Sequence, residues 1–435
     1  MNKTKLIDII SGKNISEYYE LYKKTQWNSK EEMEEFQLNK LKKLVEHCYQ
    51  NVPYYTEIMK NNDIRPSDIN SIKDLEKFPI LTKEIIKENY EKFYPLNQAK
   101  LKGVKTSQTG GTTGNILYKR NDAQTRSSVW GSYKRFYDWM GIGEKDRDFS
   151  YWGGHVLGHG LKQTLAEFVA RKIKNSIFIN AYDTRPETFS NIVSILNNQN
   201  IQLIRSYPQA LYSLALKLKQ KNYKFSIKAI MTTSEPLMPQ HRELFKEVFG
   251  AESYDQYGCG EIGAIAYECN QHDGLHITEE RVIVESNDKH ELLLTDLDNY
   301  TMPYIRYWNA DQATFSEQEC SCGRKSRVIK QVLGRTCDYL NGINGETLHW
   351  AYFWHLLFDT EIATKRNFKK FQIVQKEPDY LLFRTVGDPL SNEDKVLLTS
   401  MVREKMGNMK IEYINEKDIE NTKSGKYRPV INETL

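Results

Sequence analysis

One uncharged stretch, Thr106–Gly114, has the residue types needed to bind phosphate groups. It reads Thr-Ser-Gln-Thr-Gly-Gly-Thr-Thr-Gly and combines hydroxyl side chains with three glycines. Glycine lets backbone N–H groups approach a ligand closely, and the hydroxyls add donors at short range. The stretch lacks both the Gly-Lys-Ser/Thr ending of a Walker A loop and the spacing of a dinucleotide-binding fingerprint. It is a candidate oligophosphate-binding loop, and a polar surface loop is the alternative.

A second group has the side chains of a metal site. Cys269 and His272 are separated by two residues, and Cys320 and Cys322 follow as a second close pair. Two close pairs of this kind are typical of a structural zinc site. His276 would also be within reach of Cys269. We predict the ligands Cys269, His272, Cys320 and Cys322, and buried and surface cysteines that bind no metal are the alternative.

The first 100 residues or so are predicted to be helical. Ser29 and Glu32 form a capping box ahead of an apolar helix face. This helix is expected to end at Asn51-Val-Pro, because the residue before a proline disfavours helical geometry. Pro79 and Thr82 indicate the start of another helix.

From about residue 175, short apolar runs alternate with amphipathic helices. The expected strands are 177–179, 201–204 and 227–232, and the expected helices are 186–196, 208–218 and 239–249. This order predicts a parallel sheet with helices on its faces, where ligands bind at the carboxyl ends of the strands. Two polar segments, Thr232–Pro236 and Asp255–Glu261, are expected to follow strands in this way.

The period changes to two from Arg281 to Leu297, which predicts a β-hairpin around residues 287–290. A smaller α+β unit is predicted after Arg335. We therefore expect an α/β protein with a large N-terminal domain, residues 1–335, and a small C-terminal domain, residues 336–435. The small domain's expected elements are a helix near 346–358, strands near 370–374 and 381–386, a helix between 391 and 407, and a strand at 410–414.

Composition excludes several classes of protein. The 435 residues are 39% hydrophobic and 27% charged, which is ordinary for a soluble globular protein. A net charge of +4 gives no indication of nucleic acid binding. The sequence shows neither an apolar leader nor a run of about eighteen apolar residues, so we expect no signal peptide and no membrane span. Six cysteines in this length are sparse and favour a reducing, cytoplasmic setting.

Seven segments, taken in order, resemble the adenylate-forming superfamily of acyl-CoA synthetases and related ligases. The nearest resemblance is to its phenylacetate–CoA ligase and CapK-like (capsular polysaccharide biosynthesis) branch, whose members often carry a structural zinc. The resembling segments are Asn51–Tyr55, Phe78–Lys83, Thr106–Gly114, Tyr257–Glu261, Met302–Tyr307 with Asp311, Gly334–Arg335 and Ser424–Arg428.

The resemblance implies that the chain uses ATP and Mg²⁺ to activate a carboxylic acid as an acyl-adenylate, with release of pyrophosphate. Glu261 would bind Mg²⁺, Tyr257 would border the adenine, and Asp311 would bind the ribose with Arg335 nearby. Lys426 would bridge the carboxylate and the α-phosphate from a mobile C-terminal domain. The implied nucleotide-binding residues are Ser107, Thr109, Gly110, Gly111, Thr112, Gly114, Ser234, Glu235, Pro236, Asp255, Tyr257, Gly258, Asp311 and Arg335, and the implied catalytic residues are Thr113, Glu261 and Lys426.

The acid-binding residues are implied less directly. The region of Trp152 and His155, together with Tyr207, corresponds to the acyl pocket of the superfamily, and aromatic packing of a glycine-rich loop is the alternative. His276 resembles a family position beside the active site, which is why we leave it out of the zinc set.

Two departures from the family pattern affect the predicted reaction. Many relatives have a Pro-Lys or similar pair after the phosphate loop, but here Asn115 follows, so Lys119 and Arg120 are the candidate replacement cations. The hinge usually has two consecutive acidic residues, whereas this chain has only Asp338 there. Adenylation is therefore better supported than transfer to CoA.

The predicted acceptor is CoA or another thiol, such as that of a carrier protein. The first alternative is a CoA-independent ligase that transfers the acyl group to an amine of an amino acid or amino sugar. A second alternative is a non-catalytic nucleotide-binding subunit. A zinc-ribbon nucleic-acid binder is disfavoured by the near-neutral charge. The sequence leaves the acid, the pathway and the oligomeric state open.

Overall fold

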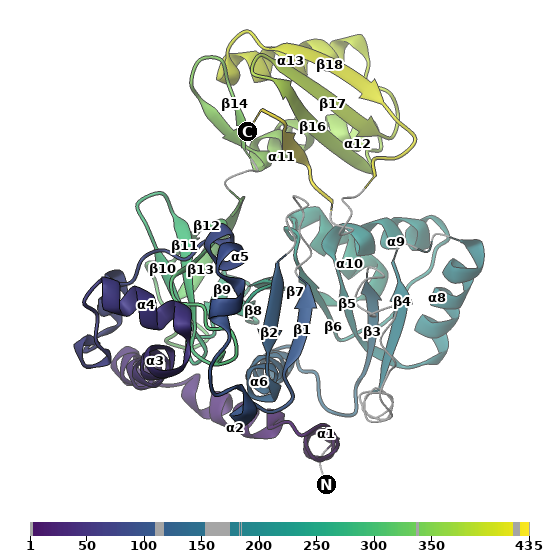
Figure 1. The fold of residues 1–435 in the computed structure, drawn as a ribbon. Helices are drawn as coiled ribbons and strands as arrows, with labels where there is room; N and C mark the ends of the chain where they lie inside the picture. The colour runs from purple at the N-terminus through teal and green to yellow at the C-terminus, as the bar shows by residue number, and fades with distance from the viewer. Residues whose placement is uncertain are drawn as a thin grey trace. The chain divides into compact units, whose positions relative to one another are not determined.

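The computed structural model describes residues 3–108, 117–152, 175–335, 339–420 and 427–434, apart from residues 182 and 184. The chain divides into two compact units (Figure 1). The large unit consists of Met1–Asn309 and Ala313–Val332, and the small unit consists of Ala310–Gln312 and Leu333–Leu435.

The large unit begins with helices, as predicted. The capping box of α3 (Lys30–Asn51) is present, since the Ser29 hydroxyl accepts from the Glu32 N–H and the Glu32 carboxylate accepts from the Ser29 N–H. The buried face of α3 packs into a hydrophobic core with strands of the main sheet. The other helices of this region are α1 (Lys3–Ser11), α2 (Ile15–Thr25), α4 (Pro53–Asn61) and α5 (Lys83–Glu88).

The predicted parallel sheet is confirmed in five adjacent strands. Their order is β7-β6-β5-β3-β4, and every neighbouring pair is parallel. The helices α8, α9 and α10 each begin with a proline, whose fixed φ suits the first helical turn. The bounds are β3 (Arg147–Trp152), β4 (Ser176–Asn180), α8 (Pro186–Asn198), β5 (Ile201–Ser206), α9 (Pro208–Gln220), β6 (Ala229–Thr233), α10 (Pro239–Phe249) and β7 (Glu252–Cys259).

Both faces of this parallel region are covered. Ile204 of β5 points into the core that includes residues of α8, α9 and α10. Its neighbour Leu203 points to the opposite face, into a core with Phe136 of α6 (Ala123–Trp139). This alternation follows from the period of two in a strand, and it explains why the strands read as continuous apolar runs.

The sheet continues beyond β7 to a total of eleven strands in the described part of the chain, in the order β10-β11-β12-β13-β9-β8-β7-β6-β5-β3-β4. The pairs β7–β8, β8–β9, β9–β13 and β10–β11 are antiparallel. The predicted hairpin is confirmed as β10 paired with β11. Asp255 was expected to follow a strand, but it lies within β7. The polar residues of β7 interrupt the apolar pattern by which a buried strand is recognised in a sequence. The added strands are β8 (Gly263–Glu268), β9 (Leu275–Ile277), β10 (Val282–Ser286), β11 (Glu291–Asp296), β12 (Tyr307–Phe315) and β13 (Val328–Arg335).

A separate hairpin carries the candidate phosphate loop. Strand β1 (Lys105–Gln108) pairs antiparallel with β2 (Tyr118–Asn121), and Gln108 lies opposite Tyr118. The predicted loop therefore starts inside β1, with Thr106 and Ser107 in the strand. Its remaining residues, Thr109–Gly114, lie outside the described part of the chain.

The small unit contains a four-stranded sheet in the order β18-β17-β16-β19. The predicted cap of α13 (Asn392–Met406) is confirmed by reciprocal hydrogen bonds between Ser391 and Asp394. The helix expected from Glu346 begins later, because β15 (Thr347–His349) first pairs with β14 (Tyr339–Asn341). The other elements are α11 (Trp350–Asp359), α12 (Ile362–Lys365), β16 (Lys370–Glu377), β17 (Tyr380–Val386), β18 (Lys410–Asn415) and β19 (Val430–Asn432).

Among the described residues, no helix has the length and apolar character needed to cross a membrane.

Candidate functional site

Glu261 lies in the short turn that joins β7 to β8. The pairing of these strands shifts register between Tyr257 and Gly258, so the strand is irregular just before the turn. A Cβ at Gly258 would lie 2.3 Å from the carbonyl oxygen of Gly263, so only glycine fits there. The Glu261 side chain is partly exposed.

Arg281 fixes this turn from inside the protein. Its guanidinium donates to the carbonyl of Ala264 at 2.7 Å and to that of Ile262 at 3.0 Å. The Arg281 side chain is 0% exposed and lies 3.4 Å from the Asp296 carboxylate, which balances its charge. Because the guanidinium is planar and holds its donors in a rigid fork, it sets the path of the backbone directly after Glu261.

Lys119 contacts the same turn from the β1–β2 hairpin. Its ammonium donates to the carbonyl of Gly260, the residue before Glu261. In the ladder, Lys119 lies opposite Ser107, the first predicted phosphate-binding residue. Burial lowers the pKa of Lys119, although Cys259 and Glu261 oppose this effect. The hairpin and the Glu261 turn are thus joined by a lysine.

Two tyrosines surround the Glu261 carboxylate. Burial, and after it the negative charge of Glu261, raises the pKa of both Tyr304 and Tyr307 well above the usual value. Both hydroxyls therefore stay protonated at neutral pH. Two protonated phenols and the Lys119 ammonium therefore lie near the Glu261 side chain, and a carboxylate is a ligand type that suits Mg²⁺.

Tyr257 is 8% exposed, and its hydroxyl accepts a hydrogen bond of 2.8 Å from Asn309 of β12. Asp311 lies two residues further along β12 and is also buried. Of Arg335, only the backbone is described, as the last residue of β13.

Other predicted nucleotide-binding residues lie directly after β6 and in the part of β7 that pairs with the end of β6. Asp255 accepts from the Thr232 hydroxyl at 3.1 Å. Ser234, directly after β6, has a left-handed backbone with φ of 72°, which strains a non-glycine residue and is frequent at functional turns. The next residue, Glu235, accepts from the Gln209 N–H at the start of α9, at 3.1 Å. Pro236 follows and is exposed.

Asp255 gives the site a pH dependence. Burial, and then the nearby charge of Glu268, raises the pKa of Asp255 to about 7, compared with about 3.9 in an unfolded chain. The folded state therefore holds more protons than the unfolded state between these values, so stability decreases as pH rises from about 4 to about 7. We expect Asp255→Asn, which mimics the protonated form, to be stabilised relative to wild type at pH 8 by on the order of 1–3 kcal/mol.

Urea unfolding at pH 5 and pH 8 measures this effect. The free-energy difference between variant and wild type should grow with pH, and equal differences at the two pH values would contradict the raised pKa of Asp255.

Trp152 and Tyr207, which the resemblance places in an acid-binding pocket, lie together at the carboxyl ends of the neighbouring strands β3 and β5. Their ring centroids are 4.5 Å apart. The third predicted residue of this set, His155, lies outside the described residues. The two rings form an aromatic contact at the edge of the sheet where ligands are expected.

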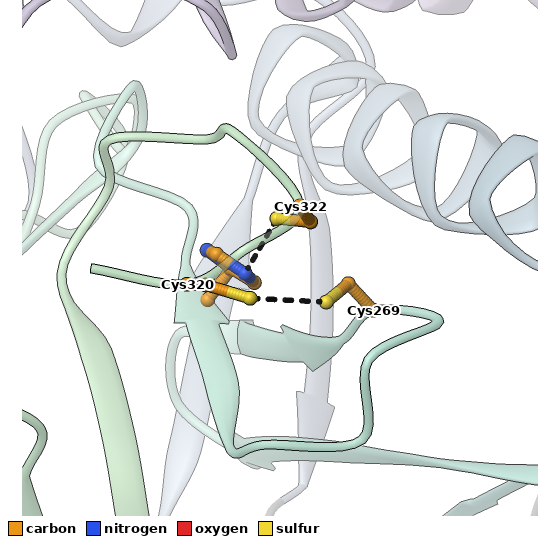
Figure 2. A group of neighbouring side chains, drawn as sticks. Cys269, Cys320 and Cys322 are labelled. Atoms are coloured by element: carbon orange, nitrogen blue, oxygen red, sulfur yellow. Dashed lines mark hydrogen bonds between the residues drawn. The ribbon is translucent and has the colours of Figure 1, made fainter. Parts of the chain in front are cut away.

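Four side chains form a separate cluster at β9 and the segment between β12 and β13 (Figure 2). The ligand atoms of Cys269, His276, Cys320 and Cys322 all lie within 4.8 Å of one another. The sulfurs of Cys269 and Cys320 are 3.7 Å apart, and the Cys322 sulfur is 3.3 Å from His276 Nε2. Tetrahedral zinc with Zn–S bonds of about 2.3 Å would place two sulfurs roughly 3.8 Å apart.

The predicted fourth ligand, His272, is not part of this cluster. Its Nδ1 lies 3.4 Å from the carboxylate of Glu268, and its ring packs on Tyr254. His276 takes the place in the cluster instead, because β9 directs its Nε2 towards Cys322 while its Nδ1 lies 3.0 Å from the Ser326 hydroxyl. The prediction of His272 is wrong for this cluster.

Electrostatics also suit a metal at these four residues. Burial raises the pKa of Cys269 to about 12, so its thiolate needs a nearby positive charge. Burial lowers the pKa of His276 to about 4, which keeps the imidazole neutral, the form that binds metals. All four positions come from protein side chains, and such a closed set is typical of structural zinc.

The remaining predicted residues, Thr109, Gly110, Gly111, Thr112, Thr113, Gly114 and Lys426, lie outside the described residues. Sequence reasoning missed Arg281, because a single arginine ahead of an apolar strand carries no signal that it binds a turn.

The chain is similar in sequence to a known domain family and to characterised enzymes. Residues 358–433 match the CapK C-terminal domain family. Over 343 residues the chain is 24% identical to a phenylacetate–coenzyme A ligase of Thermus thermophilus, covering 72% of this chain and 73% of the relative. Over 339 residues it is 25% identical to a phenylacetate–coenzyme A ligase of Escherichia coli, covering 73% and 74%.

The fold has a counterpart among solved structures. A 2-hydroxyisobutyryl-CoA ligase in its postadenylation state matches with a TM-score of 0.74 at 16% identity, over 94% of this chain and 91% of that one. The chain therefore carries a match to the CapK C-terminal domain family at residues 358–433, is similar over nearly three quarters of its length to phenylacetate–coenzyme A ligases, and shares the fold of an acyl-CoA ligase.

Proposed function

We propose that this protein is an ATP- and Mg²⁺-dependent ligase that activates a carboxylic acid as an acyl-adenylate and transfers the acyl group to CoA or another thiol. The observation that carries the proposal is the Glu261 turn. It presents a partly exposed carboxylate at the end of β7, and Lys119 ties it to the hairpin that leads into the Thr/Gly loop.

The chemistry of each group of residues suits one role in binding ATP or the acid. Neutral hydroxyl and N–H donors of residues 107–114 would bind the β- and γ-phosphates, and Glu261 would hold Mg²⁺. The ion, when bound, neutralises charge on the phosphate oxygens. Asp311 would orient the ribose, and Trp152, His155 and Tyr207 would contact the acid. Lys426 would hold the attacking carboxylate against the α-phosphate, so that the oxygen displaces pyrophosphate in line.

Acid-dependent exchange of labelled pyrophosphate into ATP tests the first half-reaction directly. We expect exchange with some members of a panel of aryl, aliphatic and amino acids, and AMP with a thioester once CoA is added. Exchange at background for the whole panel would overturn the proposal. ATP binding in that case would instead support a non-catalytic nucleotide-binding subunit. An amide formed from an added amine without CoA would favour the CoA-independent alternative.

We further propose that Cys269, His276, Cys320 and Cys322 bind a structural zinc ion. The support is the spacing of the four ligand atoms and the neutral state of His276. The role would be to hold β9 to the segment before β13.

Metal analysis of the purified protein should give about one zinc per chain. Cys320→Ser and His276→Asn should lower the zinc content and destabilise the fold, because both remove a ligand. The control is His272→Asn, which should keep the metal, since that ring lies beside Glu268. Wild-type protein without zinc would contradict the site, and loss of zinc in His272→Asn alone would restore the ligand set expected from the sequence.

A further inference from the structure

We infer that Ser128 is a positioning residue for Glu261. The Ser128 hydroxyl sets the direction of the Arg281 guanidinium, which in turn holds the backbone directly after Glu261. The inference rests on the proposed function, in which Glu261 binds Mg²⁺. It extends that site to a residue of helix α6 that acts through Arg281.

Ser128 connects a buried cation to a buried carboxylate. The residue is 0% exposed. Its hydroxyl accepts from Arg281 Nε at 3.3 Å and donates to the Asp298 carboxylate at 2.6 Å. A hydroxyl can do both at once because it has one donor and two acceptor lone pairs. The O–H bond therefore points to Asp298, and a lone pair faces Arg281.

Asp298 gives this connection a fixed end. Its side chain is 3% exposed and forms an ion pair of 2.6 Å with Lys40 of α3. Its carbonyl accepts from the Thr125 hydroxyl at 3.1 Å, and its N–H donates to the Asp296 carboxylate at 3.1 Å. Residues of α3, α6 and β11 thus hold Asp298 in place. The Ser128 hydroxyl passes this position on to Arg281.

The Arg281 guanidinium has a partner at each of its three nitrogen atoms. The two terminal nitrogens donate to the carbonyls of Ala264 and Ile262, and the Asp296 carboxylate lies beside the second of them. In the described part of the chain, Nε has one hydrogen bond, to Ser128. Because the guanidinium is planar, a contact at Nε fixes the rotation of the whole group. Removing the hydroxyl leaves Nε buried without a partner and lets the guanidinium turn away from the two carbonyls.

Ser132 offers a matched comparison on the same helix. It lies one turn after Ser128 and is also 0% exposed. Its hydroxyl donates to the Val129 carbonyl at 2.8 Å and lies 2.8 Å from the Tyr267 hydroxyl. Loss of this hydroxyl removes a similar amount of buried hydrogen bonding but leaves the contacts of Arg281 intact.

Mg²⁺ titration of acid-dependent pyrophosphate exchange tests the inference. In Ser128→Ala, the Mg²⁺ concentration for half-maximal exchange should rise about 3- to 10-fold, the size expected when one hydrogen bond is lost. The exchange rate at saturating Mg²⁺ should stay within about twofold of wild type, because excess ion restores occupancy of the site. Arg281→Lys, which keeps the charge but not the rigid fork, should raise the half-maximal concentration further. Ser132→Ala should match wild type in both quantities.

Hydrogen exchange of the backbone gives a second readout, which requires no activity. The amides of Cys259–Ala264 should exchange faster in Ser128→Ala than in wild type, because the turn is held less firmly. They should exchange at the wild-type rate in Ser132→Ala.

A Mg²⁺ dependence that is the same in Ser128→Ala and Ser132→Ala overturns the inference and leaves the proposed function intact. A lower rate at saturating Mg²⁺ without a shift in the half-maximal concentration also overturns it, because a general loss of folded protein gives that result. A wild-type protein without acid-dependent pyrophosphate exchange overturns the proposed function. In that case, unchanged hydrogen exchange of the turn in Ser128→Ala overturns the inference separately. If Ser128→Ala does not fold, Ser128→Cys, which keeps the size of the side chain, replaces it.

Discussion

Lys426→Ala should lower acid-dependent pyrophosphate exchange by about a thousandfold or more, while the affinity for ATP changes less than about threefold. The lysine of the Ser424–Arg428 segment would contact the reacting carboxylate and the α-phosphate, where charge changes most. A donor that acts mainly in the transition state contributes to the rate of reaction and little to ground-state binding, and removing one typically costs 10²–10³ in rate. Loss of a full charge at the reacting centre should reach the upper end of this range.

Lys423→Ala is the matched control, since it removes the same charge three residues earlier in the chain. Exchange rates and equilibrium ATP binding are measured for both variants. Exchange that is unchanged in Lys426→Ala, or equally impaired in Lys423→Ala, would remove Lys426 from the proposed mechanism.

Glu261→Gln should lower the exchange rate about 100-fold and raise the Mg²⁺ concentration needed for half-maximal exchange. Glutamine has nearly the same shape but carries no charge, so it is a weaker ligand for a hard cation. The turn should keep its structure, because Arg281 and Lys119 bind the backbone carbonyls of Gly260, Ile262 and Ala264 and not the Glu261 side chain. A loss of activity would then report the carboxylate itself.

Glu252→Gln serves as the control for Glu261→Gln. Glu252 lies at the opposite end of β7, is exposed and forms an ion pair with Lys246. A surface ion pair of this kind contributes little to stability. Mg²⁺ titrations of the exchange reaction that coincide for wild type and Glu261→Gln would show that Glu261 does not bind the ion.

The parallel half of the sheet was predictable because its local signals agree with its tertiary structure. The sequence marks where these helices begin, because α8, α9 and α10 each have a proline at the first position. It also marks where α10 ends, because Gly250 follows it. The antiparallel half gives weaker signals. Strand β9 has only three residues, and β7 carries Asp255 and Gln256 in a central strand, where their polarity is compensated by hydrogen bonds that the sequence does not show.

The metal cluster likewise could be predicted only in part from the sequence. The spacing of Cys269 and His272 fits a zinc motif as well as the longer spacing to His276 does. The choice between the histidines depends on a turn at residues 269–274, where His272 adopts φ of 54° and Gly274 adopts φ of 100°. This turn leaves His272 beside Glu268 and lets β9 present His276 to the cysteines. Only the backbone path decides between the two rings.

The β1–β2 hairpin has a consequence for how tightly a nucleotide can be held. Its strands pair with each other and with no strand of the main sheet among the described residues. A two-stranded ladder is marginally stable by itself, so the hairpin is expected to open locally more readily than the eleven-stranded sheet unfolds. Part of the binding free energy of a polyphosphate would then go into closing the hairpin. Under the proposed function, such a coupling would lower the affinity for the polyphosphate without loosening the bound geometry, and it would speed the release of pyrophosphate.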